Sequence, residues 1–492
     1  MTSRRIAAFA GICACVFALF CFSGCNLDGV TINYFESVGR DDVPDFPDDG
    51  GGDGGGDNGG GGDNGGGGGG STDNRFAGTW IASYGDDLPE GSGQRQYAAR
   101  MVLQQKDASI TGTGQMLRFF NSGTAASDGS PFALTITGSA SQDDAILNFT
   151  AAGKFNNPPQ LNVRLIGNRL EGVFVERAAN LVVDRFGHMT WRRVSGTDID
   201  GPWVSAFRDF TVPSSPFPDR DRTASMTLAS ADSAISGIAE YVEIVPNSTP
   251  DTVPFTSATG TLQNTQLKFT LVPTDPADGE VDWFGFHAGS YFVGAYGQFD
   301  GTDLVRFGNA TWYQSPDTPK PADFQKTWIS AFRDTDATGT LEPADYLLVT
   351  NGLTVDGNTV TGTVSLLDES ATSPAFETYN IENGTVLGSK MTFDMVRSGF
   401  RFSWTLQLAN SLLVGSYQQF NSNDDFLSRG VALWRTGSTS TSGLIGTWTA
   451  SYFDTYTSSD QENRASQLAV ISITNVSGDG TISGSGFLKL AN

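Results

Sequence analysis

Cysteine and histidine, which carry much of the thiol and metal chemistry of proteins, are scarce in this sequence. The chain has 492 residues, with four cysteines and two histidines. All four cysteines lie within the first 25 residues, which excludes thiol catalysis and cysteine-ligated zinc from the rest of the chain. The two histidines, His188 and His287, stand about 100 residues apart and no nucleophile recurs beside them. We therefore expect a protein that is not an enzyme.

Basic residues are also few. The chain has 30 lysines and arginines against 54 aspartates and glutamates, a formal net charge of −24. Nucleic-acid binding and electrostatic attachment to anionic lipid both require clustered basic side chains. The composition therefore predicts no nucleic-acid partner and no polybasic membrane anchor.

The first 24 residues are typical of a bacterial export signal. Arg4 and Arg5 precede an apolar segment, residues 6–22, and small residues then lead to Cys25. The apolar segment is close to the shortest length that spans a bilayer, so an uncleaved signal anchor is the alternative. The segment resembles a lipoprotein signal, which implies that residues 1–24 are removed and Cys25 carries lipid. In lipoproteins, Asn26 after that cysteine implies sorting to the outer membrane, on a side that the sequence leaves open.

Residues 25–75 contain a segment rich in glycine and aspartate. Between residues 41 and 74 it has almost no apolar side chain and no basic one. Such a composition cannot bury a core, and we expect a disordered linker between the lipid and the folded part of the chain. A calcium-binding Gly/Asp repeat is the alternative interpretation, but each of its turns requires an apolar residue that is missing here.

Tryptophans reveal an internal repeat in the rest of the chain. One set of tryptophans recurs every 120 to 125 residues, and the others occupy two more repeated positions. The opening set is Trp80, Trp203, Trp328 and Trp448; the closing set is Trp191, Trp312 and Trp434; the middle set is Trp283 and Trp404. The repeat predicts three complete units, at residues 76–196, 198–315 and 323–438, and a truncated fourth at 444–492.

Apolar and polar residues alternate within each unit, as they do in residues 132–137 and 161–165. This period of two predicts half-buried strands, and turn sequences such as Asp356-Gly357-Asn358 separate them. We count about eight short strands per unit and predict an all-β protein of tandem, antiparallel, up-and-down barrels. The fourth unit is too short to close a barrel, so we expect it to be open, swapped with another chain, or the remnant of a longer sequence.

The units resemble the calycin superfamily, which includes the lipocalins and avidins. The resemblance rests on the Gly-x-Trp of the opening strand at Trp80 and on closing Trp-Arg pairs, at Trp191-Arg192 and Trp434-Arg435. It implies a barrel in which a cation from the last strand packs over the opening tryptophan at the closed end. It also implies a possible ligand in the barrel mouth.

Two middle-strand tryptophans, Trp283 and Trp404, are the candidate ligand-binding residues, with barrel core as the alternative role.

Residues 334–345 match the spacing of a twelve-residue calcium loop. Its predicted oxygen ligands are Asp334, Asp336, Thr338, Thr340 and Asp345. Calcium is thus a possible cofactor, and an ordinary acidic loop is the alternative.

These observations predict a non-enzymatic, lipid-anchored surface protein whose barrels bind a partner or support the cell envelope. The unidentified partner would be a protein, a glycan or a small molecule. The alternative is a carrier that holds an apolar or aromatic small molecule in the barrel mouths. Large inward-facing side chains would favour the first function, and small ones the second.

Overall fold

The computed structural model describes thirteen segments of the chain. They are residues 74–86, 95–120, 131–155, 157–196, 198–212, 219–245, 248–333, 335–336, 345–368, 375–437, 445–458, 461–476 and 482–491. These residues are nearly all in antiparallel strands, which confirms the predicted fold class. Among them, no helix is long and apolar enough to cross a lipid bilayer.

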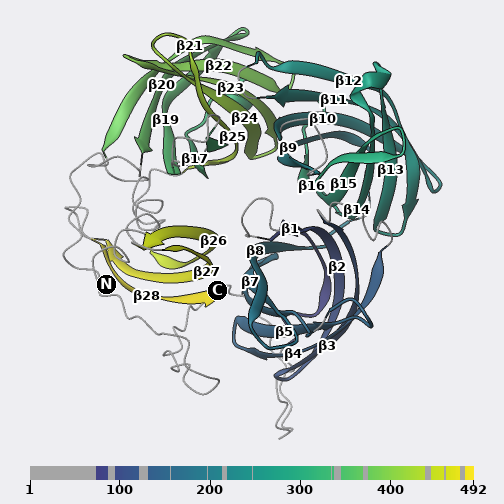
Figure 1. Ribbon diagram of the computed structural model, residues 1–492. Helices are drawn as coiled ribbons and strands as arrows, with labels where there is room; N and C mark the ends of the chain where they lie inside the picture. Colours follow the sequence, from purple (N-terminus) through teal and green to yellow (C-terminus); the bar gives the residue numbers. More distant parts are fainter. Residues whose placement is uncertain are drawn as a thin grey trace, which may run out of the picture.

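Barrel 1 is a closed sheet of eight strands in sequence order (Figure 1). Its strands are β1 (Gly78–Gly85), β2 (Arg95–Lys106), β3 (Ser109–Phe120), β4 (Phe132–Ser141), β5 (Asp144–Thr150), β6 (Gln160–Ile166), β7 (Arg169–Arg177) and β8 (Val183–Arg193). Pairing of β1 with β8 closes the barrel and leaves it no free edge.

Barrel 2 repeats this topology and closes through β9 and β16. Its strands are β9 (Gly201–Thr211), β10 (Arg220–Ala231), β11 (Ala234–Ile244), β12 (Asp251–Gln263), β13 (Gln266–Pro273), β14 (Glu280–Ala288), β15 (Tyr291–Asp300) and β16 (Asp303–Gln314). A short 3-10 turn, η1 (Pro276–Asp278), precedes β14.

Barrel 3 follows a one-turn helix, α2 (Pro321–Phe324), and closes through β17 and β25. Its strands are β17 (Trp328–Arg333), β18 (Thr335–Asp336), β19 (Asp345–Asp356), β20 (Thr359–Asp368), β21 (Phe376–Leu387), β22 (Lys390–Arg397), β23 (Phe400–Ala409), β24 (Leu412–Asn421) and β25 (Phe426–Thr436). The two-residue β18 also pairs with β25, so β17 and β18 together occupy the place of one first strand.

The last strands form an open sheet, which we call the terminal sheet: β26 (Gly446–Ser458), β27 (Gln461–Val476) and β28 (Ile482–Ala491). Its pairing copies the start of a barrel. Trp448 lies opposite Ile471, as Trp80 lies opposite Met101 in barrel 1. The open form is one of the three alternatives that the length of the fourth unit allowed.

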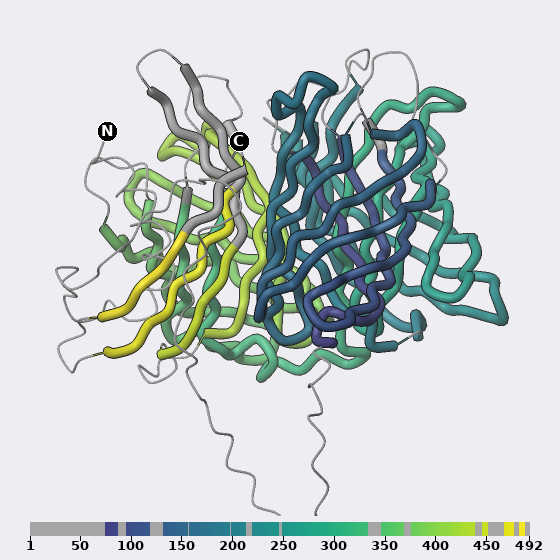
Figure 2. Tube along the Cα trace, turned by 90° about the horizontal axis from the view of Figure 1, so that it is seen from below, coloured from purple at the N-terminus to yellow at the C-terminus, as the bar shows by residue number. Residues whose placement is uncertain are grey.

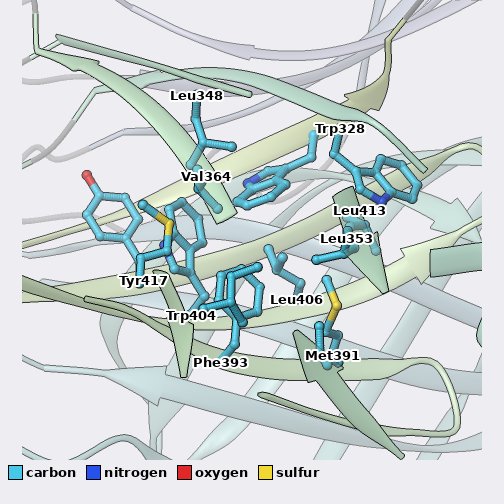
Figure 3. Close-up of a cluster of buried hydrophobic side chains, with 14 of the residues drawn as sticks. Trp328, Leu348, Leu353, Val364, Met391, Phe393, Trp404, Leu406, Leu413 and Tyr417 are labelled. Atoms are coloured by element: carbon cyan, nitrogen blue, oxygen red, sulfur yellow. The ribbon is translucent and has the colours of Figure 1, made fainter. Parts of the chain in front are cut away.

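Successive side chains along each strand point alternately into the barrel and away from it, so they lie in two different environments. On β1, Trp80, Ala82 and Tyr84 face the barrel interior, whereas Ile81 faces barrel 2. Each barrel has its own core of aromatic and aliphatic side chains, and Figure 3 shows the tryptophans, leucines and phenylalanine that meet inside barrel 3. Burial of this apolar surface is the main stabilising contribution, because the described residues contain no cysteine.

The two ends of each barrel differ in their connections. At one end, which we call the turn end, every connection has two residues, as at Asp107-Ala108, Asn264-Thr265 and Gly357-Asn358. The first residue of these turns has a positive φ, for example 53° at Asp107 and 57° at Asn264. Aspartate, asparagine and glycine tolerate this conformation better than other residues, which explains their use at these turns.

At the opposite end, which we call the mouth end, most connections are longer and differ between barrels. They include residues 86–94 in barrel 1, 212–219 in barrel 2 and 337–344 in barrel 3, between the first two long strands of each barrel. Figure 2 shows the strands of the three barrels running between the same two faces of the molecule. The mouth ends therefore share one face, and the turn ends share the other.

The barrels pack side by side around a common centre (Figure 1). The first three strands of barrel 1 contact β14–β16 of barrel 2, and the first strands of barrel 2 contact β23–β25 of barrel 3. The terminal sheet returns to contact β7 and β8 of barrel 1. Each contact thus joins the first strands of one unit to the last strands of another.

Candidate functional site

The opening tryptophans close the turn end of the barrels. Trp80, Trp203 and Trp328 are fully buried, at 0% exposure. Each donates its indole N–H to the carbonyl of the residue four positions earlier, over 2.8 to 2.9 Å. Those earlier residues, Phe76, Ile199 and Phe324, are also fully buried. An apolar residue four positions before tryptophan is therefore the sequence signal for this end, and our sequence reasoning missed it.

A cation does pack over the first tryptophan of barrel 1, but it is not the one that the resemblance implied. Arg193 lies 4.5 Å from the ring centre of Trp80. Arg192, which directly follows Trp191, instead lies 4.3 Å from the ring of Tyr291 in barrel 2. The reason is strand alternation, because the residue after the inward-facing Trp191 must point outward.

The predicted ligand-binding residue Trp283 lies deep in the core of barrel 2. It is 1% exposed, and its indole N–H donates to the hydroxyl of Tyr241 over 2.9 Å. Its ring centre lies 4.5 Å from that of Tyr296 and 5.4 Å from that of Trp312. Neighbouring rings therefore occupy the positions around the indole where a ligand would have to bind.

Trp404 has the same surroundings in barrel 3. It is 2% exposed and lies 4.7 Å from Tyr417, 5.0 Å from Trp434 and 5.3 Å from Phe332, measured between ring centres. Figure 3 shows Trp404 beside Tyr417 and Phe393. The close packing is typical of a core residue.

A polar cluster lies inside the mouth end of barrels 1 and 2, and it is the candidate functional site. Its central carboxylates are Asp86 and Asp209, each six residues after the opening tryptophan. Each faces an arginine six residues before the closing tryptophan, Arg185 or Arg306. Asp334 and Asp454 hold the same sequence position in the other two units. The spacing of this aspartate and arginine from the repeated tryptophans was a sequence signal for the polar cluster, and our sequence reasoning did not use it.

In barrel 1, the cluster combines ion pairs with tyrosines. Arg185 lies 2.6 Å from Asp86, and the hydroxyl of Tyr97 donates to the same carboxylate over 3.2 Å. Arg95 pairs with Glu176 at 3.2 Å. Burial raises the pKa of Asp86 to about 6, against the opposing effect of Arg185 and Arg95. Burial also raises the pKa of Glu176.

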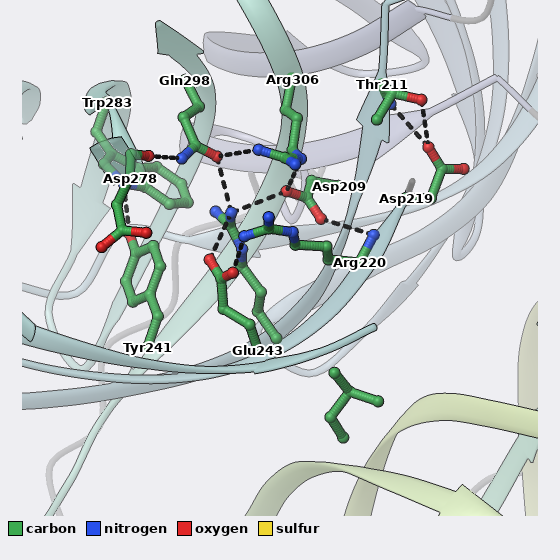
Figure 4. Close-up of polar contacts among 12 residues, drawn as sticks. Asp209, Thr211, Asp219, Arg220, Tyr241, Glu243, Asp278, Trp283, Gln298 and Arg306 are labelled. Atoms are coloured by element: carbon green, nitrogen blue, oxygen red, sulfur yellow. Dashed lines mark hydrogen bonds and ion pairs between the residues drawn. The ribbon is translucent and has the colours of Figure 1, made fainter. Parts of the chain in front are cut away.

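In barrel 2, Arg222 stands at the repeat position of Tyr97. It belongs to a larger network of ion pairs and hydrogen bonds, which Figure 4 shows. One Nη atom of Arg222 lies 2.8 Å from Glu243, 3.1 Å from Asp209 and 2.8 Å from the Gln298 amide oxygen. Arg222 and Asp209 have fully buried side chains.

Two more arginines, Arg220 and Arg306, complete the network of barrel 2. Arg220 pairs with Glu243, and Arg306 donates to Gln298 over 3.4 Å. Burial and the neighbouring arginines lower the pKa of Arg220 to about 10, so it stays charged at neutral pH. The carboxylates thus face guanidinium groups rather than an incoming substrate, and the cluster acts as a polar plug.

Among the described residues of barrel 3, neutral side chains stand at the positions of the arginine and the mouth tyrosine of this plug. Ser428 replaces the arginine and donates its hydroxyl to Gln419 over 2.7 Å. The hydroxyl of Tyr346 donates to the same amide oxygen over 3.4 Å. Arg429, one residue later, faces outward and lies 3.4 Å from Asp221 of barrel 2. A shift of one residue along β25 therefore moves an arginine from the barrel interior to the interface between barrels.

A small cavity adjoins the cluster of barrel 1. It has a volume of about 10 Å³ and is lined mainly by aromatic side chains together with Leu161 and Glu176. Strand pairing places Leu161 at the repeat position of Trp283 and Trp404. The smaller leucine explains why space remains here. The volume suits about one water molecule, far below the 300 Å³ or more of a typical ligand pocket.

The remaining predicted sites lie outside the described residues. Asp334, Thr338, Thr340 and Cys25 are not described, and of Asp336 and Asp345 the backbone alone is. Within the described part of the chain, no group of three or more potential ligand side chains could hold a metal ion. The calcium loop and the lipidation site therefore stay predictions.

Comparisons with known proteins do not assign the chain to a family. No family model matches it, and no curated protein sequence does. A protein of unknown function from Nostoc punctiforme aligns at 12% identity, over 48% of this chain and 96% of its own, with a TM-score of 0.17. Transferrin binding protein B from Neisseria meningitidis aligns at 12% identity, over 69% of this chain and 66% of its own, with a TM-score of 0.22. The Haemophilus parasuis protein of that name aligns at 10% identity, over 73% and 75%, with a TM-score of 0.20. Similarities this low carry no argument about function.

Proposed function

We propose that this chain is a non-enzymatic, lipid-anchored protein of the bacterial outer membrane. Its barrels act as a rigid scaffold that presents the mouth-end loops to a protein or glycan partner. The observation that carries this proposal is the filled interior. Trp283 and Trp404 occupy the centres of barrels 2 and 3, and paired side chains plug the mouth ends.

The contrast between the barrel ends supports a binding role for the mouth face. The turn end uses two-residue turns throughout, whereas the mouth end carries longer connections that differ in sequence between barrels. Loops on a rigid scaffold are the usual place for recognition, because their sequence can vary without disturbing the core. Three barrels with their mouths on one face also offer several binding sites at once, which increases avidity.

Photo-crosslinking on intact cells tests the binding face. A photoreactive amino acid would replace the exposed mouth-end residues Asp275 and Asp424, one at a time, with Asp107 and Asp232 at the turn end as matched controls. The proposal predicts a discrete crosslinked product from the mouth-end positions and none from the turn-end positions. Equal products from both ends would contradict it.

Binding of a fluorescent apolar probe separates this function from a small-molecule carrier. N-phenyl-1-naphthylamine should show no saturable binding to the full chain, because Trp283 and Trp404 fill barrels 2 and 3 and the cavity described in barrel 1 has room for about one water molecule. Saturable binding that is lost in Leu161→Phe, which narrows the cavity of barrel 1, would support the carrier. Leu387→Phe is the control, because Leu387 is 77% exposed and lies on the surface.

Replacement of Cys25 tests the anchor. We expect Cys25→Ser to release the protein from the membrane fraction and to abolish incorporation of a radioactive fatty acid. Label that survives in Cys25→Ser would contradict lipidation at this residue.

A further inference from the structure

The residue after each closing tryptophan lies on the side of its barrel nearest the common centre. These residues are Arg192, Tyr313 and Arg435. They face outward, because the tryptophans before them face the barrel interior. Their strands, β8, β16 and β25, lie on the inner side of the ring of barrels (Figure 1). The repeat therefore brings equivalent side chains of the three barrels toward one place, at the turn end.

The tyrosines of barrel 2 join this place to the two other barrels. Each of the three residues has a strand partner beside it: Arg169 beside Arg192, Tyr291 beside Tyr313, and Leu412 beside Arg435. The guanidinium of Arg192 lies 4.3 Å from the ring centre of Tyr291 and 5.8 Å from that of Tyr313. Both tyrosines also pack in one apolar cluster with Leu412 of barrel 3. Arginines of barrels 1 and 3 thus approach the same pair of rings from opposite sides.

Positive charge exceeds negative charge in this group, which we call the central arginine cluster: Arg169, Arg192 and Arg435 with Glu171. Arg169 lies 3.3 Å from Glu171, which also accepts a hydrogen bond from Thr190 over 2.7 Å. Within the described part of the chain, neither Arg192 nor Arg435 forms an ion pair. Burial, followed by repulsion from Arg169 and Arg192, lowers the pKa of Arg435. The cluster has a formal charge of about +2 in a chain whose net charge is −24.

Solvent reaches the cluster. Arg435 is exposed, the Arg169 side chain is 30% exposed, and Arg192 is half-buried. A guanidinium that lies over an aromatic ring keeps N–H groups along its edge that can donate to an anion. The surrounding rings also lower the local dielectric, which strengthens attraction between these groups and an anion.

We propose that the central arginine cluster binds a phosphate group, which belongs either to free phosphate or to a lipid headgroup. The planar guanidinium donates two parallel hydrogen bonds to a phosphate, a geometry that suits arginine better than lysine. A phosphate monoester carries a charge of about −1.5 to −2 at pH 7, which matches the excess charge of the cluster. Because the arginines belong to barrels 1 and 3, a phosphate between them also removes repulsion across the centre of the molecule.

Titration calorimetry with inorganic phosphate tests the site. The full chain carrying Cys25→Ser is titrated at constant ionic strength, and we expect saturable binding of one phosphate. Arg435→Gln should weaken this binding at least about tenfold, because it removes a charged donor. Arg397→Gln is the matched control. It removes the same charge at the mouth end, where Arg397 is 39% exposed, and should leave the affinity unchanged.

Thermal unfolding separates a binding role from a structural one. Without phosphate, Arg435→Gln should melt no lower than its parent, because the substitution relieves repulsion among the arginines. Millimolar phosphate should raise the melting temperature of the parent and of Arg397→Gln, and it should not raise that of Arg435→Gln. An arginine with only a structural role would give the reverse: a lower melting temperature without phosphate and an unchanged response to it.

Vesicle flotation identifies the source of the phosphate. The same proteins are mixed with phosphatidylcholine vesicles that contain or lack phosphatidic acid. Flotation that requires phosphatidic acid and is lost in Arg435→Gln would identify a lipid headgroup. Binding of inorganic phosphate without such flotation would identify free phosphate.

Two results would overturn the proposal. One is the absence of both phosphate binding and flotation that depends on phosphatidic acid. The other is equal binding by Arg435→Gln and Arg397→Gln. The central arginine cluster lies at the turn end, so neither result bears on the mouth face, and the proposed function is tested separately.

Discussion

Barrels 1 and 2 share a topology and differ in what fills them. Barrel 1 has Leu161 at its centre and Tyr97 at its mouth, and a small cavity remains between them. Barrel 2 has Trp283 and Arg222 at the corresponding positions, and its interior is closed by rings and ion pairs. One backbone thus accepts either a tyrosine or an arginine in the polar plug, because the strand pairing, rather than the identity of the filling residue, sets the barrel.

The largest predicted effect is the loss of the central ring of barrel 2. Trp283→Ala should lower the free energy of unfolding by about 3–5 kcal/mol, because it removes a fully buried indole and leaves a cavity. Calorimetry of the full chain would show a shifted unfolding transition. Trp448→Ala is the control and should cost less than Trp283→Ala, since Trp448 is 36% exposed whereas Trp283 is 1% exposed. Equal losses in the two variants would contradict a structural role for Trp283.

The ionic plug should be nearly as sensitive. Arg222→Met should destabilise barrel 2 by about 3 kcal/mol, because Asp209 and Glu243 would stay buried with fewer partners. Arg208→Met is the matched control, as Arg208 is partly exposed and lies 3.9 Å from its partner Asp219. Thermal denaturation of the three proteins checks this, and a control that costs as much as Arg222→Met would refute the plug.

The two barrels should also respond to pH in opposite directions. Asp86 has a folded pKa raised to about 6 from 3.8, so the folded state holds its proton more tightly than the unfolded state does. Its contribution to stability is therefore present below about pH 4 and is lost as the pH rises through about 6, a change of about 3 kcal/mol. Asp86→Asn should remove the decrease in the melting temperature of barrel 1 between about pH 4 and pH 6. If the melting temperature of Asp86→Asn still decreased in the same way, Asp86 would not titrate in this range.

In barrel 2, burial lowers the pKa of His287 from its usual 6.5. The unfolded state then binds the proton more tightly, so stability falls as the pH drops below about 6.5. His287→Phe should remove this loss of stability at low pH, because the phenylalanine ring binds no proton. The ring should fit in place of the imidazole, since His287 is fully buried and packs against Trp203, with 5.7 Å between the ring centres. Melting curves from pH 5 to 8 measure the effect, and a fall that persists in His287→Phe would contradict it.

The smallest predicted effect concerns the calcium loop of barrel 3. If residues 334–345 bind calcium, millimolar calcium should raise the melting temperature of barrel 3, and a chelator should reverse the change. Asp334→Ala should abolish the difference by removing the first ligand. Equal melting with calcium and with chelator would identify an ordinary acidic loop at the mouth end.

Much of the fold could be predicted from local pattern. The alternation of apolar and polar residues specifies strands, and the recurrence of Trp80, Trp203 and Trp328 specifies the repeated units. Two-residue turns then bring neighbouring strands together, so an up-and-down order of strands follows from local information, whereas closure of the barrel requires the long-range pairing of β1 with β8. The candidate site was less accessible, because Asp86 and Arg185 lie about 100 residues apart and meet only when β1 pairs with β8.

By itself, the sequence determined the strands, the turns and the number of repeats, because these depend on neighbours along the chain. The tertiary structure alone decided which apolar face meets which barrel. Ile81 and Trp80 are both apolar neighbours on β1, yet one packs between barrels and the other inside. Likewise, Leu468 finds its partners Val173 and Phe186 nearly 300 residues earlier in the chain. Such contacts depend on the shape of whole barrels, and no local pattern encodes that shape.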